Sequence, residues 1–269
     1  QSISGVELKE FDSKKSGDYA KKKQRLFEIN ELAARYYQQS LVSNSHVQEY
    51  VFSKRKLTKQ TVQDFRIGYA PGGGDALVSI LKKRGFNERE LSDAGVTNRF
   101  GGDLFRSRMM LPLMDPAGKV IGFTGRILED EPNAPKYLNT PQTLIYDKSR
   151  HVFGLHLAKD SIRKQKRAVI VEGNMDVVSS HQAGVAQVVA TAGTALTDWQ
   201  LKSLARLTET VVLAFDSDKA GLAATERAIP IAREAGVELM IVTLPGEAKD
   251  PDELIQEDVS LWQQAIETA

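Results

Sequence analysis

The stretch Val211-Val-Leu-Ala-Phe-Asp-Ser-Asp218 joins an uninterrupted apolar run to two carboxylates. β-Branched and aromatic residues without a polar break are typical of a strand buried on both faces of a parallel sheet. Ala168-Val-Ile-Val171 precedes Glu172 in the same way, and the run Leu239–Leu244 ends shortly before Asp250. Because ligands of open α/β sheets bind beyond the carboxyl ends of the strands, we expect these acids to meet at one edge of a sheet.

Six carboxylates would gather at this edge as three pairs: Glu172 with Asp176, Asp216 with Asp218, and Asp250 with Asp252. Like charges so close together repel strongly, so a cluster of this kind requires bound cations. Mg²⁺ prefers a few carboxylates together with waters and substrate phosphates, which suits pairs of acids one residue apart. The sequence therefore predicts a magnesium site.

Each pair also has a purely structural interpretation. Asp218 directly precedes a helix expected over residues 222–235 and fits an N-cap. Glu172 could cap the helix that follows it, and Asp250 precedes Pro251, a favourable first helical residue. We favour the metal site, because the three acidic motifs occur together and in this order.

The composition is that of an ordinary globular protein: 269 residues, 41% hydrophobic and 26% charged, enough to bury a sizeable core. No apolar stretch is long enough for a membrane span, and no secretory signal opens the chain. The absence of cysteine excludes disulfides and thiolate metal sites. These features are compatible with the cytosol.

The net charge of +1 hides a division between two halves. Residues 1–167 contain 30 Lys and Arg against 19 Asp and Glu, whereas residues 168–269 contain 6 against 16. An asymmetry of this size indicates a polyanionic partner for the basic half and cations for the acidic half. The alternative is that the opposite charges simply hold the two halves together.

We predict three parts: a flexible lead-in over residues 1–20, a basic part over 21–167 and an acidic part over 168–269. In the basic part we expect a helix over 21–42, a strand over 65–69, and a hairpin pairing 109–113 with 119–123 around an Asp-Pro-Ala-Gly turn. Strand and helix patterns alternate after residue 167, which argues for βαβ units. The expected fold class is α/β, with an α+β part followed by a parallel sheet flanked by helices.

The acidic motifs resemble the TOPRIM domain, the fold shared by bacterial primases, topoisomerases and some nucleases. That family has a Glu after its first strand, an Asp-x-Asp after a later strand and a further acidic motif, here Glu172, Asp216-Ser-Asp218 and Asp250-Pro-Asp252.

The basic half is similar to the catalytic core of DnaG-type bacterial primases. Four stretches carry this resemblance: Phe65-Arg-Ile-Gly-Tyr-Ala-Pro71, Phe105-Arg-Ser-Arg-Met-Met-Leu-Pro112, Gly118-Lys-Val-Ile-Gly-Phe-Thr-Gly-Arg126 and Pro135-Lys-Tyr-Leu-Asn-Thr-Pro141. It extends over residues 24–256 and departs at Gly74 and Asn174, where the family usually has Trp and Tyr.

The resemblance implies synthesis of short RNA primers on single-stranded DNA by metal-dependent nucleotidyl transfer. The implied catalytic residues are Glu172, Asp216 and Asp218. Those expected to hold Mg²⁺, for which Mn²⁺ can substitute, are Glu172, Asp216, Asp218, Asp250 and Asp252, with Asp176 as a supporting acid. Phosphates of template and nucleotide are expected at Arg106, Arg108, Arg126, Lys136 and Lys148, and Tyr137 could stack on a base.

The implied partners are ribonucleoside triphosphates, the RNA primer and the replicative helicase, at the replication fork of the bacterial cytoplasm. The start at Gln1 without a methionine suggests an excised piece. We expect a zinc-binding part, closing helices and a helicase-docking domain to lie outside it, so no zinc in this fragment and weak activity. Two rivals stay open: another TOPRIM enzyme, a topoisomerase or nuclease using the same acids, and a metal-dependent single-strand-binding module without turnover.

Overall fold

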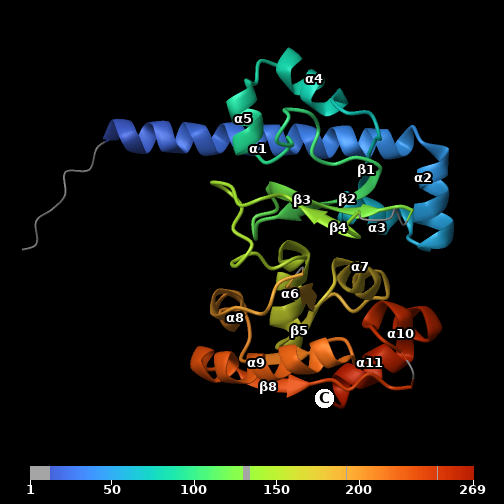
Figure 1. The fold of residues 1–269 in the computed structure, drawn as a ribbon. Helices are drawn as coiled ribbons and strands as arrows, with labels where there is room; N and C mark the ends of the chain where they lie inside the picture. The colour runs from blue at the N-terminus through green and yellow to red at the C-terminus, as the bar shows by residue number, and fades with distance from the viewer. Residues whose placement is uncertain (1–12, 130–133, 192, 247) are drawn as a thin grey trace, which may run out of the picture.

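The computed structural model describes residues 13–129, 134–191, 193–246 and 248–269. It contains two four-stranded sheets, an antiparallel one in the N-terminal half and a parallel one in the C-terminal half, each covered by helices (Figure 1). The predicted fold class is therefore confirmed. Within these ranges, no helix combines the length and the apolar character needed to cross a membrane.

A long helix, α1 (Ser13–Val42), runs across the antiparallel sheet (Figure 1). Residues 13–20 belong to the predicted lead-in over 1–20 and continue this helix, which was expected to begin at residue 21, while residues 1–12 lie outside the described residues. The lead-in is polar and shows no apolar period, so a helix start there left no pattern. The apolar face of α1 packs Leu26, Ile29 and Tyr37 into a core with Phe123 of the sheet.

The rest of the basic half is built from short elements. They are α2 (Ser45–Glu49), the π-helix η1 (Tyr50–Lys54), α3 (Lys59–Asp64), β1 (Gly68–Ala70), α4 (Ala76–Lys83), α5 (Glu88–Asp93), β2 (Arg108–Met114), β3 (Val120–Ile127) and β4 (Tyr137–Asn139). The sheet order is β1-β2-β3-β4, and every neighbouring pair is antiparallel. The predicted hairpin is confirmed, because β2 and β3 pair in antiparallel fashion. In the turn between them, the Asp115 carboxylate accepts the backbone N–H groups of Ala117 and Lys119. The predicted strand over 65–69 starts later, since Arg66 adopts a left-handed turn between α3 and β1.

The second half alternates strands and helices, as predicted. Its elements are α6 (Leu155–Gln165), β5 (Arg167–Val171), α7 (Asn174–Gln182), β6 (Val188–Ala190), α8 (Asp198–Ala205), β7 (Thr210–Leu213), α9 (Lys219–Ala235), β8 (Glu238–Ile241), α10 (Pro251–Glu257) and α11 (Val259–Glu267). The order β6-β5-β7-β8 is parallel throughout. Alternate residues of β5 enter different cores: Val169 and Val171 pack with α7 and α11, while Ala168 and Ile170 pack with α6 and α9.

Strand β8, which the apolar run Leu239–Leu244 predicted, is less buried than this apolar sequence suggested. β8 ends at Ile241, three residues before the predicted end of the run, and Ile241 is 46% exposed. The reason is its position at the edge of the sheet, where one side of the strand has no neighbouring strand.

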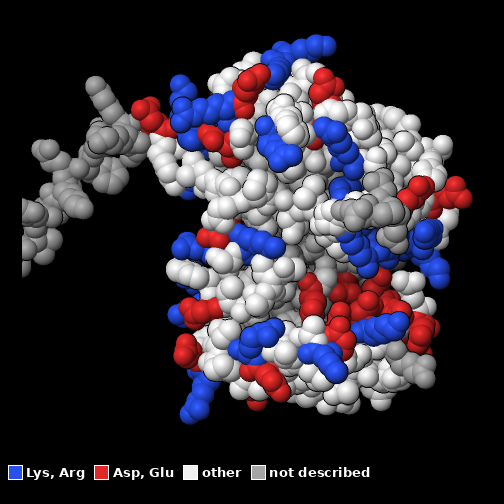
Figure 2. All heavy atoms as spheres, viewed as in Figure 1, with Lys and Arg blue, Asp and Glu red and all other residues white. Residues whose placement is uncertain are grey.

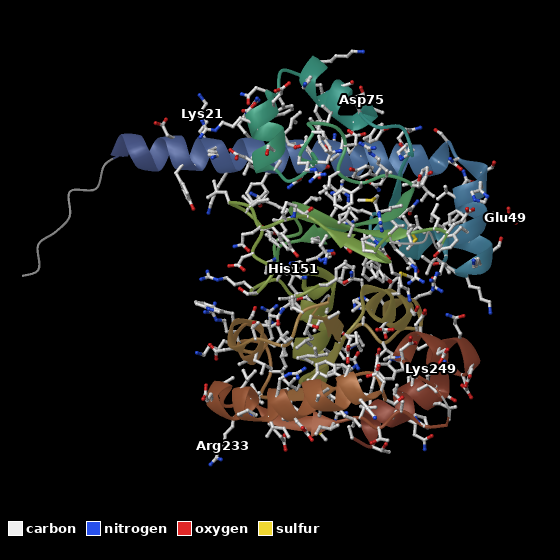
Figure 3. The ribbon with its side chains drawn as sticks, in the orientation of Figure 1. Lys21, Glu49, Asp75, His151, Arg233 and Lys249 are labelled. Carbon is white, nitrogen blue, oxygen red and sulfur yellow. The ribbon has the colours of Figure 1, made fainter. Side chains whose placement is uncertain are left out.

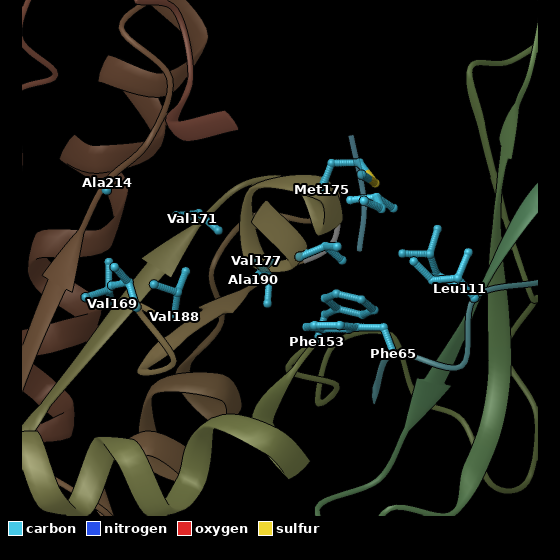
Figure 4. Packing of buried hydrophobic residues seen from close by; sticks show 14 of the residues in the cluster. Phe65, Leu111, Phe153, Val169, Val171, Met175, Val177, Val188, Ala190 and Ala214 are labelled. Atoms are coloured by element: carbon cyan, nitrogen blue, oxygen red, sulfur yellow. The ribbon is translucent and has the colours of Figure 1, made fainter. Parts of the chain in front are cut away.

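The two halves share one apolar core. Phe65 and Phe153 stack with their ring centroids 6.1 Å apart, and Leu111 of β2 lies in the same cluster as Val177 of α7 (Figure 4). This shared core holds the antiparallel sheet against the α7 side of the parallel sheet, so the carboxyl edge of the parallel sheet faces the basic half.

Candidate metal and nucleotide site

A cavity of about 570 Å³ lies between the two halves. One wall carries the acids Glu172, Asp176, Asp216, Asp250, Asp252 and Glu253. The opposite wall carries Arg55, Arg126, Lys136 and Tyr137. Figure 2 shows acidic side chains gathered around a hollow, with basic side chains directly above them. The structure thus brings together five of the six predicted acids and three of the six predicted basic or stacking residues.

Two of these acids are placed by the ends of neighbouring strands. Glu172 follows β5 directly and Asp216 lies just past β7, which pairs with β5. The backbone N–H of Asp216 donates to Glu172 Oε1 at 3.3 Å. Helix α9 starts close to this point, because Gly221 has no side chain: a Cβ there would overlap the backbone carbonyl oxygen of Asp216.

The other three acids come from helix starts on the same side of the sheet. Asp176 lies in the first turn of α7 and accepts the backbone N–H of Gly173 at 3.0 Å and that of Asp252 at 3.3 Å. Asp250 caps α10 by accepting the N–H of Glu253 at 2.8 Å. The Asp252 carboxylate accepts the hydroxyl of Ser179 in a short hydrogen bond. These contacts fix the backbone around the acids without supplying a positive charge.

Burial and repulsion both disfavour ionised acids in this wall. Burial first, and then the charges of Glu172, Asp250 and Asp218, raise the pKa of Asp216 to about 6. Asp176 is buried, and its pKa is raised well above the ordinary value by burial and by three neighbouring aspartates. Burial also raises the pKa of Glu172. A bound cation would relieve this repulsion, so the donor set fits a divalent metal ion.

The carboxylates do not form a finished cage. Among the residues that the structure describes, no three His, Asp or Glu side chains stand close enough to hold an ion as they are.

The basic wall is preorganised by hydroxyl groups. Arg126 of β3 donates to the hydroxyl of Tyr137 at 2.7 Å and to that of Tyr50 at 3.2 Å, and its guanidinium lies 5.4 Å from the Tyr137 ring centroid. Burial opposes the charge, but the two tyrosines outweigh it and raise the pKa of Arg126. Lys136 faces the acids, since its charge lowers the pKa of Asp216.

Arg55 is a site residue that the sequence analysis missed. It ends the π-helix η1 and reaches across the cavity, where its guanidinium lies 3.6 Å from the Asp252 carboxylate. It also donates to the Tyr50 hydroxyl at 3.1 Å. π-Turns are frequent at functional sites, but nothing in the cluster Lys54-Arg55-Lys56 marks which of its cations points inward.

Four predicted site residues lie outside the cavity lining. Asp218 is exposed, and its carboxylate caps α9 through the N–H groups of Ala220 and Gly221. Arg106 donates to backbone carbonyls near the start of α4, and Arg108 is buried with its guanidinium on the carbonyls of Gly125 and Lys136. Lys148 is partly buried in the segment before α6. Their roles stay predictions.

Two protein-family models match the chain, one in each of the two halves that contain the sheets. A model described as "Toprim-like" matches residues 169–255, so the parallel-sheet half is a domain of the TOPRIM class. A model described as "DNA primase catalytic core, N-terminal domain" matches residues 36–159.

Solved structures cover both halves together. The DnaG primase catalytic domain bound to ssDNA is 34% identical with a TM-score of 0.84, covering 93% of this chain and 80% of that one. The RNA polymerase domain of Mycobacterium tuberculosis primase is 33% identical with a TM-score of 0.78, covering 91% and 87%. The chain belongs to the family of DnaG-type DNA primase catalytic cores.

The chain matches only part of its full-length relatives. The DNA primase of Clostridium acetobutylicum is 42% identical over 254 residues, which are 92% of this chain and 42% of that protein. For the DNA primase of Synechococcus elongatus, the identity is 40%, and the shares are 87% and 35%. The chain therefore spans less than half the length of these relatives. Its TOPRIM-class domain implies the use of a divalent metal.

Proposed function

We propose that this chain is a primase catalytic core that joins ribonucleotides into short RNA primers on single-stranded DNA. The observation that carries the proposal is the cavity with two oppositely charged walls: five acids lie at the edge of a parallel sheet, opposite Arg126 and Lys136. A metal-bound nucleoside triphosphate has the complementary charges, because its phosphates need cations and its metal needs carboxylates.

Each wall has its own task in nucleotidyl transfer. Asp216, Asp218 and Asp250, with Asp252 beside them, would hold Mg²⁺ or Mn²⁺. A bound ion of this kind would supply Lewis-acid chemistry, lowering the pKa of the primer 3′ hydroxyl and balancing the charge of the triphosphate. Glu172 is a further ligand or accepts the hydroxyl proton, a role that suits a carboxylate whose pKa is raised.

The basic wall orients the substrates. Arg126 is held by two tyrosine hydroxyls, so it presents a fixed guanidinium to phosphate oxygens at little cost in side-chain entropy. Lys136 adds a mobile charge, and Tyr137 offers its ring to a base. These contacts position phosphates and bases without reading sequence.

The wider setting of the reaction follows from the family. We propose single-stranded DNA, ribonucleoside triphosphates and the RNA primer as partners in the bacterial cytoplasm. The replicative helicase would bind through a part of the full-length protein beyond this core.

Incorporation of labelled ribonucleotides on a single-stranded template tests the proposal. With Mg²⁺ or Mn²⁺ we expect primers from the wild-type chain and a loss of about 1,000-fold for Asp216→Ala, because a lost metal site removes several kcal/mol of transition-state stabilisation.

Glu226→Gln is the matched control, since Glu226 is an exposed acid on α9 away from the cavity lining. It should leave incorporation unchanged. Equal activity of the wild-type and Asp216→Ala proteins would contradict the proposal, and relaxation of supercoils or nicking of DNA would favour another TOPRIM reaction.

A further inference from the structure

Two buried residues that line the cavity carry a polar group without a hydrogen-bond partner. These groups are the amide oxygen Oδ1 of Asn174, a residue only 5% exposed, and the hydroxyl of Thr124, which is fully buried. Neither group meets a donor or an acceptor within the ranges that the structure describes. Since an unpaired polar group is costly to bury, a ligand in the cavity that pairs with both would gain from doing so.

Thr124 belongs to the basic wall. It lies on β3 two residues before Arg126, so the two side chains point to the same face of the sheet. Arg126 stands opposite Tyr137 in the pairing with β4. Thr124 stands opposite Asn139, which also lines the cavity. The basic wall therefore has an uncharged row beside the row that carries the guanidinium, about 7 Å further along the strands.

Asn174 belongs to the acidic wall. It is the first residue of α7 and lies between Glu172 and Asp176 in the sequence, but it carries no charge. It is also one of the two positions at which the sequence departs from the primase motifs. In Figure 3, Glu49 of the basic half and Lys249 of the acidic half lie above and below the junction between the halves. The two unpaired groups thus border the same cavity from its two sides.

The chemistry of the two groups fits a pair of hydroxyls. An amide oxygen only accepts a hydrogen bond, whereas a threonine hydroxyl both donates and accepts. Neither group is charged, so phosphates are bound better at Arg126 than in the uncharged row. The ribose of a nucleotide is joined directly to the α-phosphate, so phosphates held at Arg126 place the sugar close by. Its 2′- and 3′-hydroxyls each offer one donor and can also accept.

We propose that Asn174 and Thr124 bind the 2′- and 3′-hydroxyls of the incoming nucleotide and so select ribonucleotides over deoxyribonucleotides. The inference rests on the proposed function for the nucleotide itself. A site that hydrogen-bonds a substrate hydroxyl discriminates against the analogue that lacks it, because the analogue leaves the buried group unpaired. The two side chains determine specificity without contributing to the charge of either wall.

Competition binding of ATP, 2′-deoxy-ATP and 3′-deoxy-ATP in the presence of Mn²⁺ tests the site. The wild type should bind ATP about 10-fold more tightly than either deoxy form, as expected for the loss of one hydrogen bond. Thr124→Val and Asn174→Leu remove the polar groups at similar size, and the double variant should bind all three nucleotides alike. Ser180→Ala removes a buried, unpaired hydroxyl outside the cavity lining, so this matched control should keep the wild-type preference.

Two further measurements exclude a structural or metal-binding role. Because neither group has a partner in the free protein, the double variant should unfold at the same temperature as the wild type or higher. Its affinity for Mn²⁺ without nucleotide should be unchanged.

Three results would overturn the inference: a wild type that binds the three nucleotides equally, a double variant that keeps the preference for ATP, or a double variant that loses Mn²⁺ affinity. Each leaves the binding of triphosphate intact, so the proposed function would stand. Failure of all three nucleotides to bind the wild type would contradict the proposed function, and the inference with it.

Discussion

The two halves of the molecule treat charge in opposite ways. In the parallel-sheet half, acids from separate segments converge until burial and mutual repulsion raise the pKa of Glu172, Asp176 and Asp216. In the antiparallel half, Arg126 is held by uncharged tyrosine hydroxyls, which leave its positive charge uncompensated. Neither wall neutralises itself. A cavity with one acidic and one basic wall is complementary to the ligand proposed above, a metal-bound triphosphate, which carries charges of both signs.

Arg55 is the exception to this separation, and its removal is expected to have the largest effect on the fold. It belongs to the basic half but pairs with Asp252 of the acidic half, with side chains 17% and 15% exposed. Arg55→Ala would leave Asp252 without its cation and should lower the free energy of unfolding by about 2 kcal/mol.

Urea unfolding followed by circular dichroism measures this loss. Lys56→Ala, at the exposed neighbouring position, serves as the control and should change stability little. If both variants unfolded at the same urea concentration, the ion pair between the halves would not contribute to stability.

A second effect is expected from pH, and it probes the acidic wall alone. The pKa of Asp216 rises from 3.8 to about 6 in the folded protein, so the folded state holds this proton more tightly than the unfolded state. The contribution is fully present below pH 3.8 and is lost as the pH rises through about 6. In metal-free buffer, the stability of Asp216→Asn should therefore depend less on pH in this range than that of the wild type.

Thermal unfolding across this pH window shows whether the stability contributed by Asp216 falls as the pH rises. Added Mg²⁺ should restore stability at the upper end of the window in the wild type, because the cation replaces the proton. A metal-free wild type that gained stability from Asp216 as the pH rose would show that the acids do not repel one another.

The smallest expected effect concerns Asp218, whose carboxylate caps α9. Asp218→Ala should cost about 1 kcal/mol in metal-free buffer, whereas Asp218→Asn should cost only a few tenths, because Asn caps helices equally well. Thermal unfolding separates the two. If Asn is as costly as Ala, the negative charge matters more than the cap. A fall in Mn²⁺ affinity for Asp218→Asn at unchanged stability would support its predicted metal role.

In both halves, the sequence predicted the features that local patterns encode. The strand ends before Glu172 and Asp216 followed from local apolar runs, and the hairpin at Asp115 followed from turn chemistry. These patterns are local, and the parallel topology then carries the acids to one edge.

What the sequence did not predict depends on contacts distant along the chain. Arg55 meets Asp252 only after the shared core has placed η1 beside α10, and no local pattern encodes that meeting. The exposure of β8 likewise depends on its place at the sheet edge, and the early start of α1 lay in polar sequence without apolar spacing.

The most direct test of the account is whether metal and nucleotide bind cooperatively across the two walls. Titration of a ribonucleoside triphosphate by calorimetry, with and without Mn²⁺, should show tighter binding with the metal in the wild type. This enhancement should vanish in both Asp216→Asn and Lys136→Ala, because each removes one wall. Triphosphate binding that is independent of Mn²⁺, or an enhancement that survives Asp216→Asn, would contradict the account.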